Sequence, residues 1–111
     1  MLFSSLSEDN KQIKIIDFGM ATVFSLKQKY KGKVGTPLFL APEVISGWYN
    51  HKCDVWSLGV TAFWILTGKH PFNSKSYDTL YEKIKTGQID NNKNWSSLSE
   101  NAQQFILSCL T

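Results

Sequence analysis

The fold is decided by residues 54–72, which read DVWSLGVTAFWILTGKHPF. Apolar side chains would lie on every side of a helix over residues 54–67, and Gly68 and Pro71 then stop it. A helix that is apolar all round is typical of the centre of a protein core, and this one is shorter than the roughly 20 residues that cross a bilayer. The sequence therefore predicts a central helix buried in protein.

Further helices are predicted on both sides of this one. Ser74 or Ser76 can cap the helix that follows, and Gly87 ends it. Its apolar positions repeat at helical spacing, at Tyr77, Leu80, Tyr81 and Ile84. After an Asn-rich linker, Ser97 and Glu100 predict a capping box for a last helix. The apolar face of this last helix comprises Ala102, Phe105, Ile106, Cys109 and Leu110. Residues 41–45 predict a short helix upstream.

The N-terminal third of the chain lacks helical periodicity. Residues 1–4 and 13–16 are strand candidates, and the polar stretch between them predicts a hairpin. Glycines punctuate residues 17–35, which predict a long loop, and residues 48–51 predict an aromatic and polar turn. Long loops in compact domains are usually functional. The predicted fold class is mainly α with a short β-hairpin at the N-terminus.

Length and composition limit the function classes. The 111 residues suffice for one small domain, and 42% hydrophobic with 19% charged residues is ordinary for a soluble globular chain. The net charge is only +3, and all 12 basic residues are lysines, so no guanidinium can grip a phosphate through two hydrogen bonds. The loop lysines are Lys27, Lys29, Lys31 and Lys33. They flank glycines and form no helical stripe, so no nucleic-acid partner is predicted.

Metal binding through cysteine or histidine and membrane insertion are not predicted either. Cys53 and Cys109 lack metal-ligand spacing and predict small buried side chains, and His51 and His70 are expected to be structural. No apolar signal-peptide core follows Met1, and no stretch is long enough to span a bilayer. We therefore expect a cytoplasmic protein with no membrane partner.

Several short motifs follow one another in order along the chain. Asp17-Phe18-Gly19 ends a predicted strand, and Gly35-Thr36-Pro37, Ala41-Pro42-Glu43 and the stretch 54–59 come after it. Each motif alone is weak, but together with residues 68–72 they resemble the large lobe of eukaryotic protein kinases. The motif at 35–37 resembles that of the Ser/Thr kinases, and the chain is most similar to the calcium/calmodulin-dependent and calcium-dependent group. The resemblance implies that residues 1–111 form one partial kinase domain, part of a lobe that is α+β in the full domain.

The resemblance assigns Asp17-Phe18-Gly19 to the nucleotide. Asp17 would bind Mg²⁺ against the phosphates of ATP, Phe18 would pack inward and set where Asp17 points, and Gly19 would permit the turn. Mg²⁺ and ATP are therefore the implied cofactors. The alternative for Asp17 is an ordinary solvated turn aspartate.

The resemblance assigns the following loop to the protein substrate. Residues after Gly19 resemble an activation segment, in which Thr22, Ser25, Tyr30 and Thr36 carry hydroxyls, none of them assigned as a phosphosite. Thr36 resembles the residue that contacts the catalytic machinery. The wall that receives the substrate residue after the phosphorylated one would be Leu38, Phe39 and Leu40. For these three side chains, plain core packing remains an alternative. A large Met20 after the metal-binding triplet implies a serine acceptor.

Two carboxylates have structural roles in the family. Glu43 would pair with a downstream arginine, and Asp54 would accept hydrogen bonds from the backbone of the upstream catalytic loop. Neither partner lies within the 111 residues. We therefore expect two buried charges without partners, at a cost of about 3–5 kcal/mol each, and a marginally stable chain.

The resemblance implies a Ser/Thr protein kinase that transfers phosphate from ATP to protein substrates. The glycine-rich loop, the strand lysine, its glutamate and the catalytic loop are not found in these residues, so we expect a truncated fragment that is inactive alone. Two alternatives are a non-catalytic interaction module that binds kinase partners and a gene-model fragment without function. Any calcium or calmodulin regulation would act through a region beyond Thr111.

Overall fold

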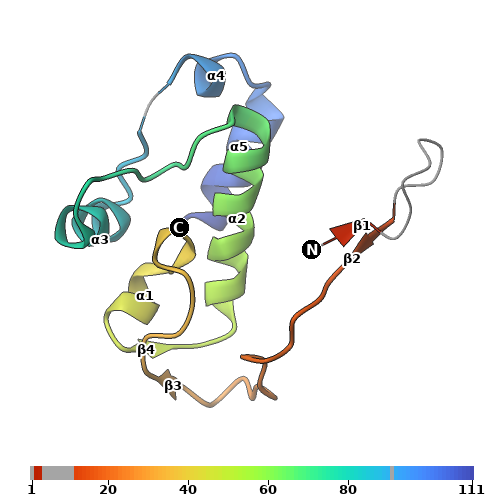
Figure 1. The fold of residues 1–111 in the computed structure, drawn as a ribbon, viewed down its shortest axis with the longest axis vertical. Helices are drawn as coiled ribbons and strands as arrows, with labels where there is room; N and C mark the ends of the chain where they lie inside the picture. Colours follow the sequence, from red (N-terminus) through yellow and green to blue (C-terminus); the bar gives the residue numbers. More distant parts are fainter. Residues whose placement is uncertain (1, 4–11, 91) are drawn as a thin grey trace.

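A computed structural model describes residues 2–3, 12–90 and 92–111. Its axis is helix α2 (Lys52–Thr67), and α5 (Glu100–Cys109) lies along it, as Figure 1 shows. The two helices approach closely at Gly59, where a Cβ atom would lie 2.6 Å from the Cβ of Cys109. Only a glycine at this position on α2 permits the contact, which brings α2 and α5 together.

The core lies between α2, α5 and two other helices, α1 (Pro42–Ile45) and α3 (Tyr77–Thr86). Val60, Phe63, Phe72 and Ile106 are fully buried in it. The rings of Trp56 and Phe72 stack at 5.6 Å. These contacts confirm that residues 54–67 form the central helix of this part of the protein.

The prediction that this helix is buried on every side is wrong. One face of α2 enters the core through Trp56, Val60 and Phe63, whereas Val55, Leu58, Trp64, Ile65 and Leu66 are exposed on the other. The described residues of this chain supply neighbours for one face only. The apolar pattern therefore predicts more burial than the described residues provide.

Most predicted helix ends are confirmed. Gly68 and Gly87 follow α2 and α3 with φ values of 73° and 66°, the left-handed conformation that glycine adopts readily. Ser76 caps α3, since its side chain accepts a hydrogen bond from the backbone N–H of Thr79 at 3.3 Å. The capping box at Ser97 is wrong: Ser99 caps α5, accepting from the N–H of Ala102 at 3.3 Å.

Ser97 instead follows a short helix, which lies in the stretch predicted to be an Asn-rich linker. This helix, α4 (Lys93–Ser96), begins after Asn92, whose side chain accepts from the N–H of Trp95 at 3.0 Å. Asn94 donates from Nδ2 to the carbonyl of Thr67 at 2.8 Å, which attaches α4 to the end of α2. A single capped turn has no periodicity that a sequence pattern could reveal.

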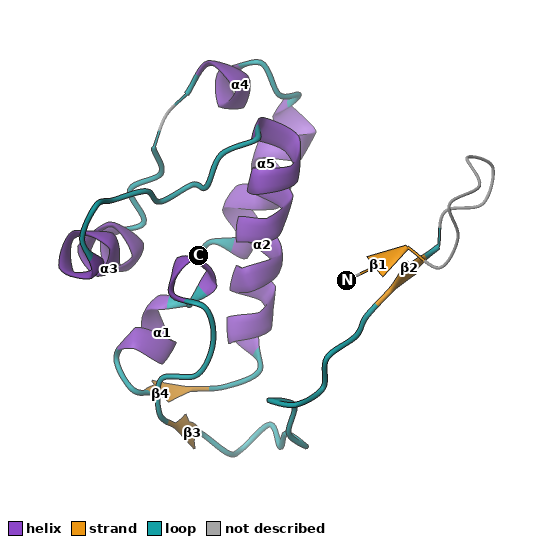
Figure 2. Ribbon diagram, viewed as in Figure 1, coloured by secondary structure: helices purple, strands orange, loops and turns teal. Residues whose placement is uncertain are grey.

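The predicted N-terminal hairpin is confirmed in shorter form. Strand β1 (Leu2–Phe3) pairs antiparallel with β2 (Ile13–Lys14), with Leu2 opposite Lys14. Met1 and Ser4, predicted as strand ends, lie outside the described residues, and residues 15–16 are not in the strand. Figure 2 shows the hairpin standing clear of the helical body.

A second antiparallel pair was not predicted. Strand β3 (Tyr30–Lys31) pairs with β4 (Trp48–Tyr49), inside stretches predicted as a loop and a turn. The rings of Tyr30 and Tyr49 lie 5.9 Å apart across the pair. Strands of two residues show no alternation, so the sequence gives no signal for them.

Two local features position the elements around the candidate site. The 3₁₀ turn η1 (Pro37–Phe39) is held to α2 by Ser57, whose Oγ donates to the carbonyl of Phe39 at 2.9 Å. The start of α3 is fixed by Lys83, whose Nζ donates to Asp90 Oδ1 at 2.6 Å and to the carbonyl of Asn73 at 2.7 Å. No helix within residues 2–3, 12–90 and 92–111 is long and apolar enough to cross a membrane.

Candidate functional site

A hollow of about 290 Å³ lies between the segment that ends at Glu43 and the start of α2. Met20, Thr36, Leu40, Asp54 and Ser57 are among its lining residues. The chain thus brings together Met20, which follows the Asp17-Phe18-Gly19 triplet, the Gly35-Thr36-Pro37 turn and the first turn of the central helix. These three segments are far apart in sequence, and their meeting is the main geometric feature of the site.

Asp17 is exposed and lies close to this hollow in sequence but is not part of its lining. It has a φ of 65°, and no other non-glycine residue in the described part of the chain has a positive φ. The N–H of Gly19 points to Asp17 Oδ1 over a long 3.5 Å. A left-handed backbone at a residue other than glycine is uncommon and often marks a functional turn.

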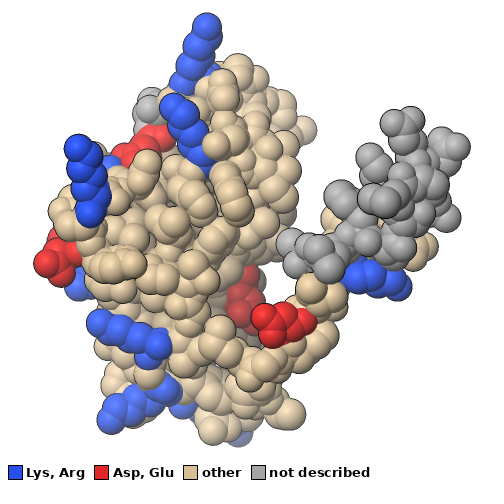
Figure 3. All heavy atoms as spheres, viewed as in Figure 1, with Lys and Arg blue, Asp and Glu red and all other residues tan. Residues whose placement is uncertain are grey.

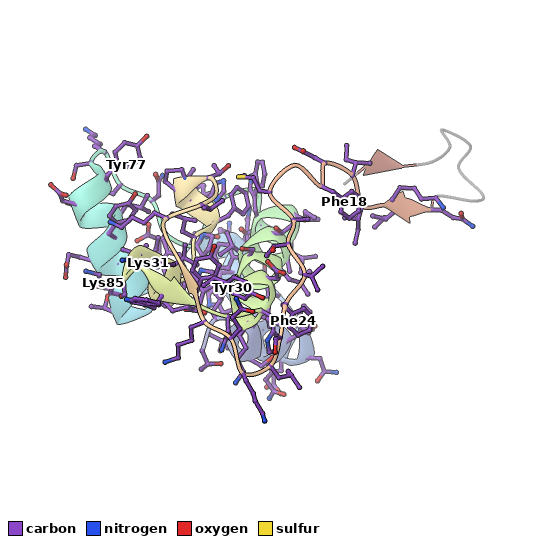
Figure 4. The ribbon with its side chains drawn as sticks, turned by 90° about the horizontal axis from the view of Figure 1, so that it is seen from below. Phe18, Phe24, Tyr30, Lys31, Tyr77 and Lys85 are labelled. Carbon is purple, nitrogen blue, oxygen red and sulfur yellow. The ribbon has the colours of Figure 1, made fainter. Side chains whose placement is uncertain are left out.

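Phe18 does not pack inward as expected. Its side chain is 69% exposed, because the arm that carries it runs clear of the helices. Figure 4 shows Phe18 beside the hairpin, away from α3. The other exposed apolar residues of this arm are Ile13, Ile15, Ile16, Met20, Val23, Phe24 and Leu26. The arm therefore has apolar side chains that the helical body of this chain does not cover.

Asp17 supplies one carboxylate, which suits a metal that takes its other ligands from a nucleotide and from water. Within the described residues, no three His, Cys, Asp or Glu side chains gather as a metal site. Mg²⁺ at phosphate-transfer sites commonly takes one or two carboxylates, with phosphate oxygens and waters as the remaining ligands. A single exposed carboxylate on a constrained turn fits that role, and it does not fit a metal site made by protein alone.

The proposed substrate wall divides into two parts. Leu40 is buried in the core, and the ring of Phe39 lies 5.0 Å from that of His70 and 5.9 Å from that of Trp64. Both side chains thus take part in packing, the alternative that the sequence left open, although both also line the hollow. Leu38 points elsewhere, into a second groove beside α3.

The expectation of two buried, unpaired carboxylates is wrong for Asp54. Asp54 is exposed in the first turn of α2, and Glu43 is half-buried in the first turn of α1. Acidic residues at these positions are favoured by the helix dipole, and a solvated carboxylate does not carry the cost of a buried charge. The predicted penalty therefore does not apply to Asp54.

Sequence reasoning missed an unsatisfied donor near Glu43. The indole Nε1 of Trp56 is buried and has no hydrogen-bond partner among the described residues. Trp56 and Glu43 both line a hollow of about 260 Å³. An unpaired buried N–H typically costs about 1–3 kcal/mol, so this hollow is a local weak point of the chain taken by itself.

Cys53 is only half-buried, contrary to the prediction, whereas Cys109 is buried as predicted. Burial, followed by the nearby charges of Asp54 and Glu43, raises the pKa of Cys53 to about 11, so its thiol stays protonated at neutral pH. Burial lowers the pKa of His70, whose ring stacks on Trp64 at 4.7 Å. Burial thus favours the neutral form of each of these two groups.

A larger groove, of about 440 Å³, separates η1 from the start of α3. We call it the η1–α3 groove; its lining includes Thr36, Pro37, Leu38, Lys75, Tyr77 and Leu80. Thr36 lines both this groove and the hollow next to α2, so the two are neighbours. No single motif predicted the groove, because its walls are formed by segments about 40 residues apart in sequence.

Comparison with known proteins agrees with the motifs. The family model described as protein kinase domain matches residues 4–111. Calcium-dependent protein kinase 5 of Plasmodium berghei (strain Anka) is 41% identical over 105 residues, which cover 94% of this chain and 19% of that protein. Calcium-dependent protein kinase 5 of Plasmodium falciparum (isolate 3D7) is 37% identical over 111 residues, covering 99% and 19%.

A third relative shows the same relation. Calcium-dependent protein kinase 4 of Plasmodium berghei (strain Anka) is 44% identical over 89 residues, covering 79% of this chain and 17% of that protein. The chain spans about a fifth of the length of the curated relatives it matches.

Proposed function

The chain belongs to the protein kinase domain family, and from this premise we propose that it forms part of the large lobe of a Ser/Thr kinase that phosphorylates proteins. The observation that carries the proposal is the hollow at which Met20, Thr36 and Asp54 meet. Two segments that resemble kinase motifs, and the residue that follows the Asp17-Phe18-Gly19 triplet, thereby line one space. We propose residues 1–111 as one partial kinase domain.

In this proposal, Asp17 binds the Mg²⁺ of Mg-ATP, and Gly19 allows the chain to turn away from it. Mg-ATP, when bound, supplies the phosphoryl group and neutralises its charge. Phosphate transfer asks the protein mainly to position and to stabilise charge, so an exposed carboxylate on a constrained turn has a clear task. Phe18 contributes to the same segment and would be covered by parts of the protein that pack on the arm.

The substrate would lie along the segment from Thr36 to Leu40. The hydroxyl of Thr36 is exposed between the hollow and the η1–α3 groove and is free to contact a peptide or the reacting groups. Leu38 faces the groove, while Phe39 and Leu40 hold the segment on α2. Met20, at the mouth of the hollow, favours serine as the acceptor.

The relatives are named calcium-dependent, and we propose calcium control for the whole protein as well. Within the part of the chain that the structure describes, no cluster of acidic side chains forms a calcium site. The proposed control would therefore act on this segment through other regions.

The test is labelled-phosphate transfer from Mg-ATP to a serine-containing peptide, with the full-length protein that contains this chain. We expect Asp17→Asn to lower kcat at least about 100-fold, because a neutral amide cannot replace the charged metal ligand. Glu100→Gln, which removes an exposed charge on α5, is the matched control and should leave kcat within about twofold. Equal rates for Asp17→Asn and the unaltered protein would refute the role of Asp17.

A further inference from the structure

The η1–α3 groove is large, partly apolar and flanked by lysines that form no ion pair with another described residue. We propose that it binds the segment of a protein substrate that carries an apolar side chain followed by acidic residues. The inference rests on the proposed function, because it names the class of substrate that the kinase would prefer. The η1–α3 groove, and not the hollow next to α2, would select this substrate segment.

The apolar part of the groove comes from both walls. Pro37 and Leu38 line it from η1, and Tyr77 and Leu80 from α3. Leu80 is buried, whereas Tyr77 is 66% exposed and its ring lies 6.2 Å from that of Tyr81. Figure 4 shows Tyr77 at the outer end of α3. An exposed tyrosine over a buried leucine offers a surface that an apolar side chain can cover.

The charge of the groove is positive. Among the described residues, Lys75 is the one charged residue in its lining. Lys33 lies at its edge, with Nζ 5.6 Å from the ring centroid of Tyr81, which stacks on Tyr77. The ion pairs of the described residues are Lys83 with Asp90 and Lys85 with Glu82, so Lys33 and Lys75 are not neutralised by either pair.

Nearby acidic residues do not cancel this charge. Glu82 is 4.0 Å from Lys85, and Asp78, in the first turn of α3, does not line the groove. Figure 3 shows lysine side chains projecting along the edge of the molecule that carries α3 and, below it, β3 and β4, with acidic side chains among them near α3. Glutamate or aspartate in a bound peptide would complement this edge.

The groove is held in shape before any peptide binds. Lys83 and Asp90 fix the loop at Asn73, whose N–H donates to Asp90 Oδ2 at 2.8 Å. Ser57 fixes η1 through its bond to the carbonyl of Phe39. A preformed site loses less conformational entropy when a peptide binds. The weak attraction between exposed charges can then produce a measurable difference in affinity between peptides.

The test is fluorescence anisotropy with the full-length protein and three labelled peptides that share a serine followed by leucine. They differ in the next two residues, which are Glu-Glu, Gln-Gln or Lys-Lys. We expect the Glu-Glu peptide to bind about tenfold more tightly than the Lys-Lys peptide, and the difference to shrink as salt is raised. Equal affinity for the three peptides would overturn the proposal.

Two substitutions test the lysines. Lys75→Gln and Lys33→Gln should each weaken binding of the Glu-Glu peptide about threefold and leave the Gln-Gln peptide unchanged. Lys93→Gln, at an exposed position on α4, is the matched control and should change neither. If Lys75→Gln and Lys33→Gln leave all three affinities unchanged, the groove is not the selective site.

Binding and phosphate transfer are measured in separate arms, so the two proposals can fail separately. Tight binding of the Glu-Glu peptide without phosphorylation of its serine would contradict the kinase function and support the groove. Equal phosphorylation and equal binding of the three peptides would contradict the groove and leave the kinase function intact.

Discussion

At the scale of single residues, the site depends on side chains whose environment decides their chemistry. Asp17 has a left-handed backbone and an exposed carboxylate, which suits an ion shared with a ligand. Cys53 and His70 lie among packed side chains that disfavour their charged forms. Asp17 is therefore the candidate metal ligand among these three side chains, and the neutral forms of Cys53 and His70 are favoured.

His70 makes stability depend on pH. Because burial lowers its pKa below the ordinary 6.5, the imidazole is neutral in both states at higher pH. As pH falls below about 6.5, the unfolded chain binds a proton that the folded chain does not, so the free energy of unfolding decreases. We expect urea midpoints of the full-length protein to drop between about pH 7.5 and about pH 5.5, and His70→Gln to reduce that drop.

His51→Gln is the control for this measurement, since the ring of His51 contacts Phe24 and not the Trp64 stack. It should leave the pH dependence that His70 causes in place. An equal pH dependence in the unaltered protein and in His70→Gln would contradict the role assigned to His70.

At the scale of elements, the contact between α2 and α5 depends on a missing side chain. A Cβ atom at position 59 would lie 2.6 Å from the Cβ of Cys109 and 3.1 Å from Cδ2 of Leu110. Gly59→Ala should therefore force the helices apart and lower the free energy of unfolding by about 1–3 kcal/mol. Chemical denaturation measures the loss. Thr61→Ala, at a half-buried position on α2, should cost less, and equal costs would contradict the close contact.

Elements with strong local signals could be predicted from the sequence. Helices α2, α3 and α5 have long apolar patterns, and Ser76, Gly68 and Gly87 mark their ends. Helix α4 and the β3–β4 pair could not, because elements of two to four residues depend on tertiary contacts. The cap at Ser99 was missed because Glu100 lies three residues after Ser97 and favours Ser97 in sequence, whereas α5 begins only after Ser99 in the fold.

The candidate site, like the fold, could be predicted from the sequence only in part. The resemblance assigned Thr36 and the start of α2 to the same kinase lobe, and the structure shows that both line one hollow. The sequence could not divide residues 38–40 between groove and core, since all three are apolar. The η1–α3 groove was not predicted because it exists only once α3 is placed beside η1.

At the scale of the whole molecule, the chain has more apolar surface than its own residues cover. The outer face of α2 and the arm over residues 13–26 are exposed. Large exposed apolar surfaces in proteins usually mark interfaces. The chain spans about a fifth of the length of its relatives, and we propose that both surfaces are interfaces in the full-length protein. The marginal stability of the 111 residues alone stays a prediction, which a thermal melt of that fragment tests.

The central claim is that Asp17 binds the metal of a kinase site whose substrate wall begins at Thr36. The most direct measurement is a crystal structure of the full-length protein with Mg²⁺ and a non-hydrolysable ATP analogue. We expect a carboxylate oxygen of Asp17 about 2.1 Å from Mg²⁺, with the terminal phosphate facing the hollow at Thr36. A metal and nucleotide bound elsewhere, with Asp17 in solvent, would contradict it.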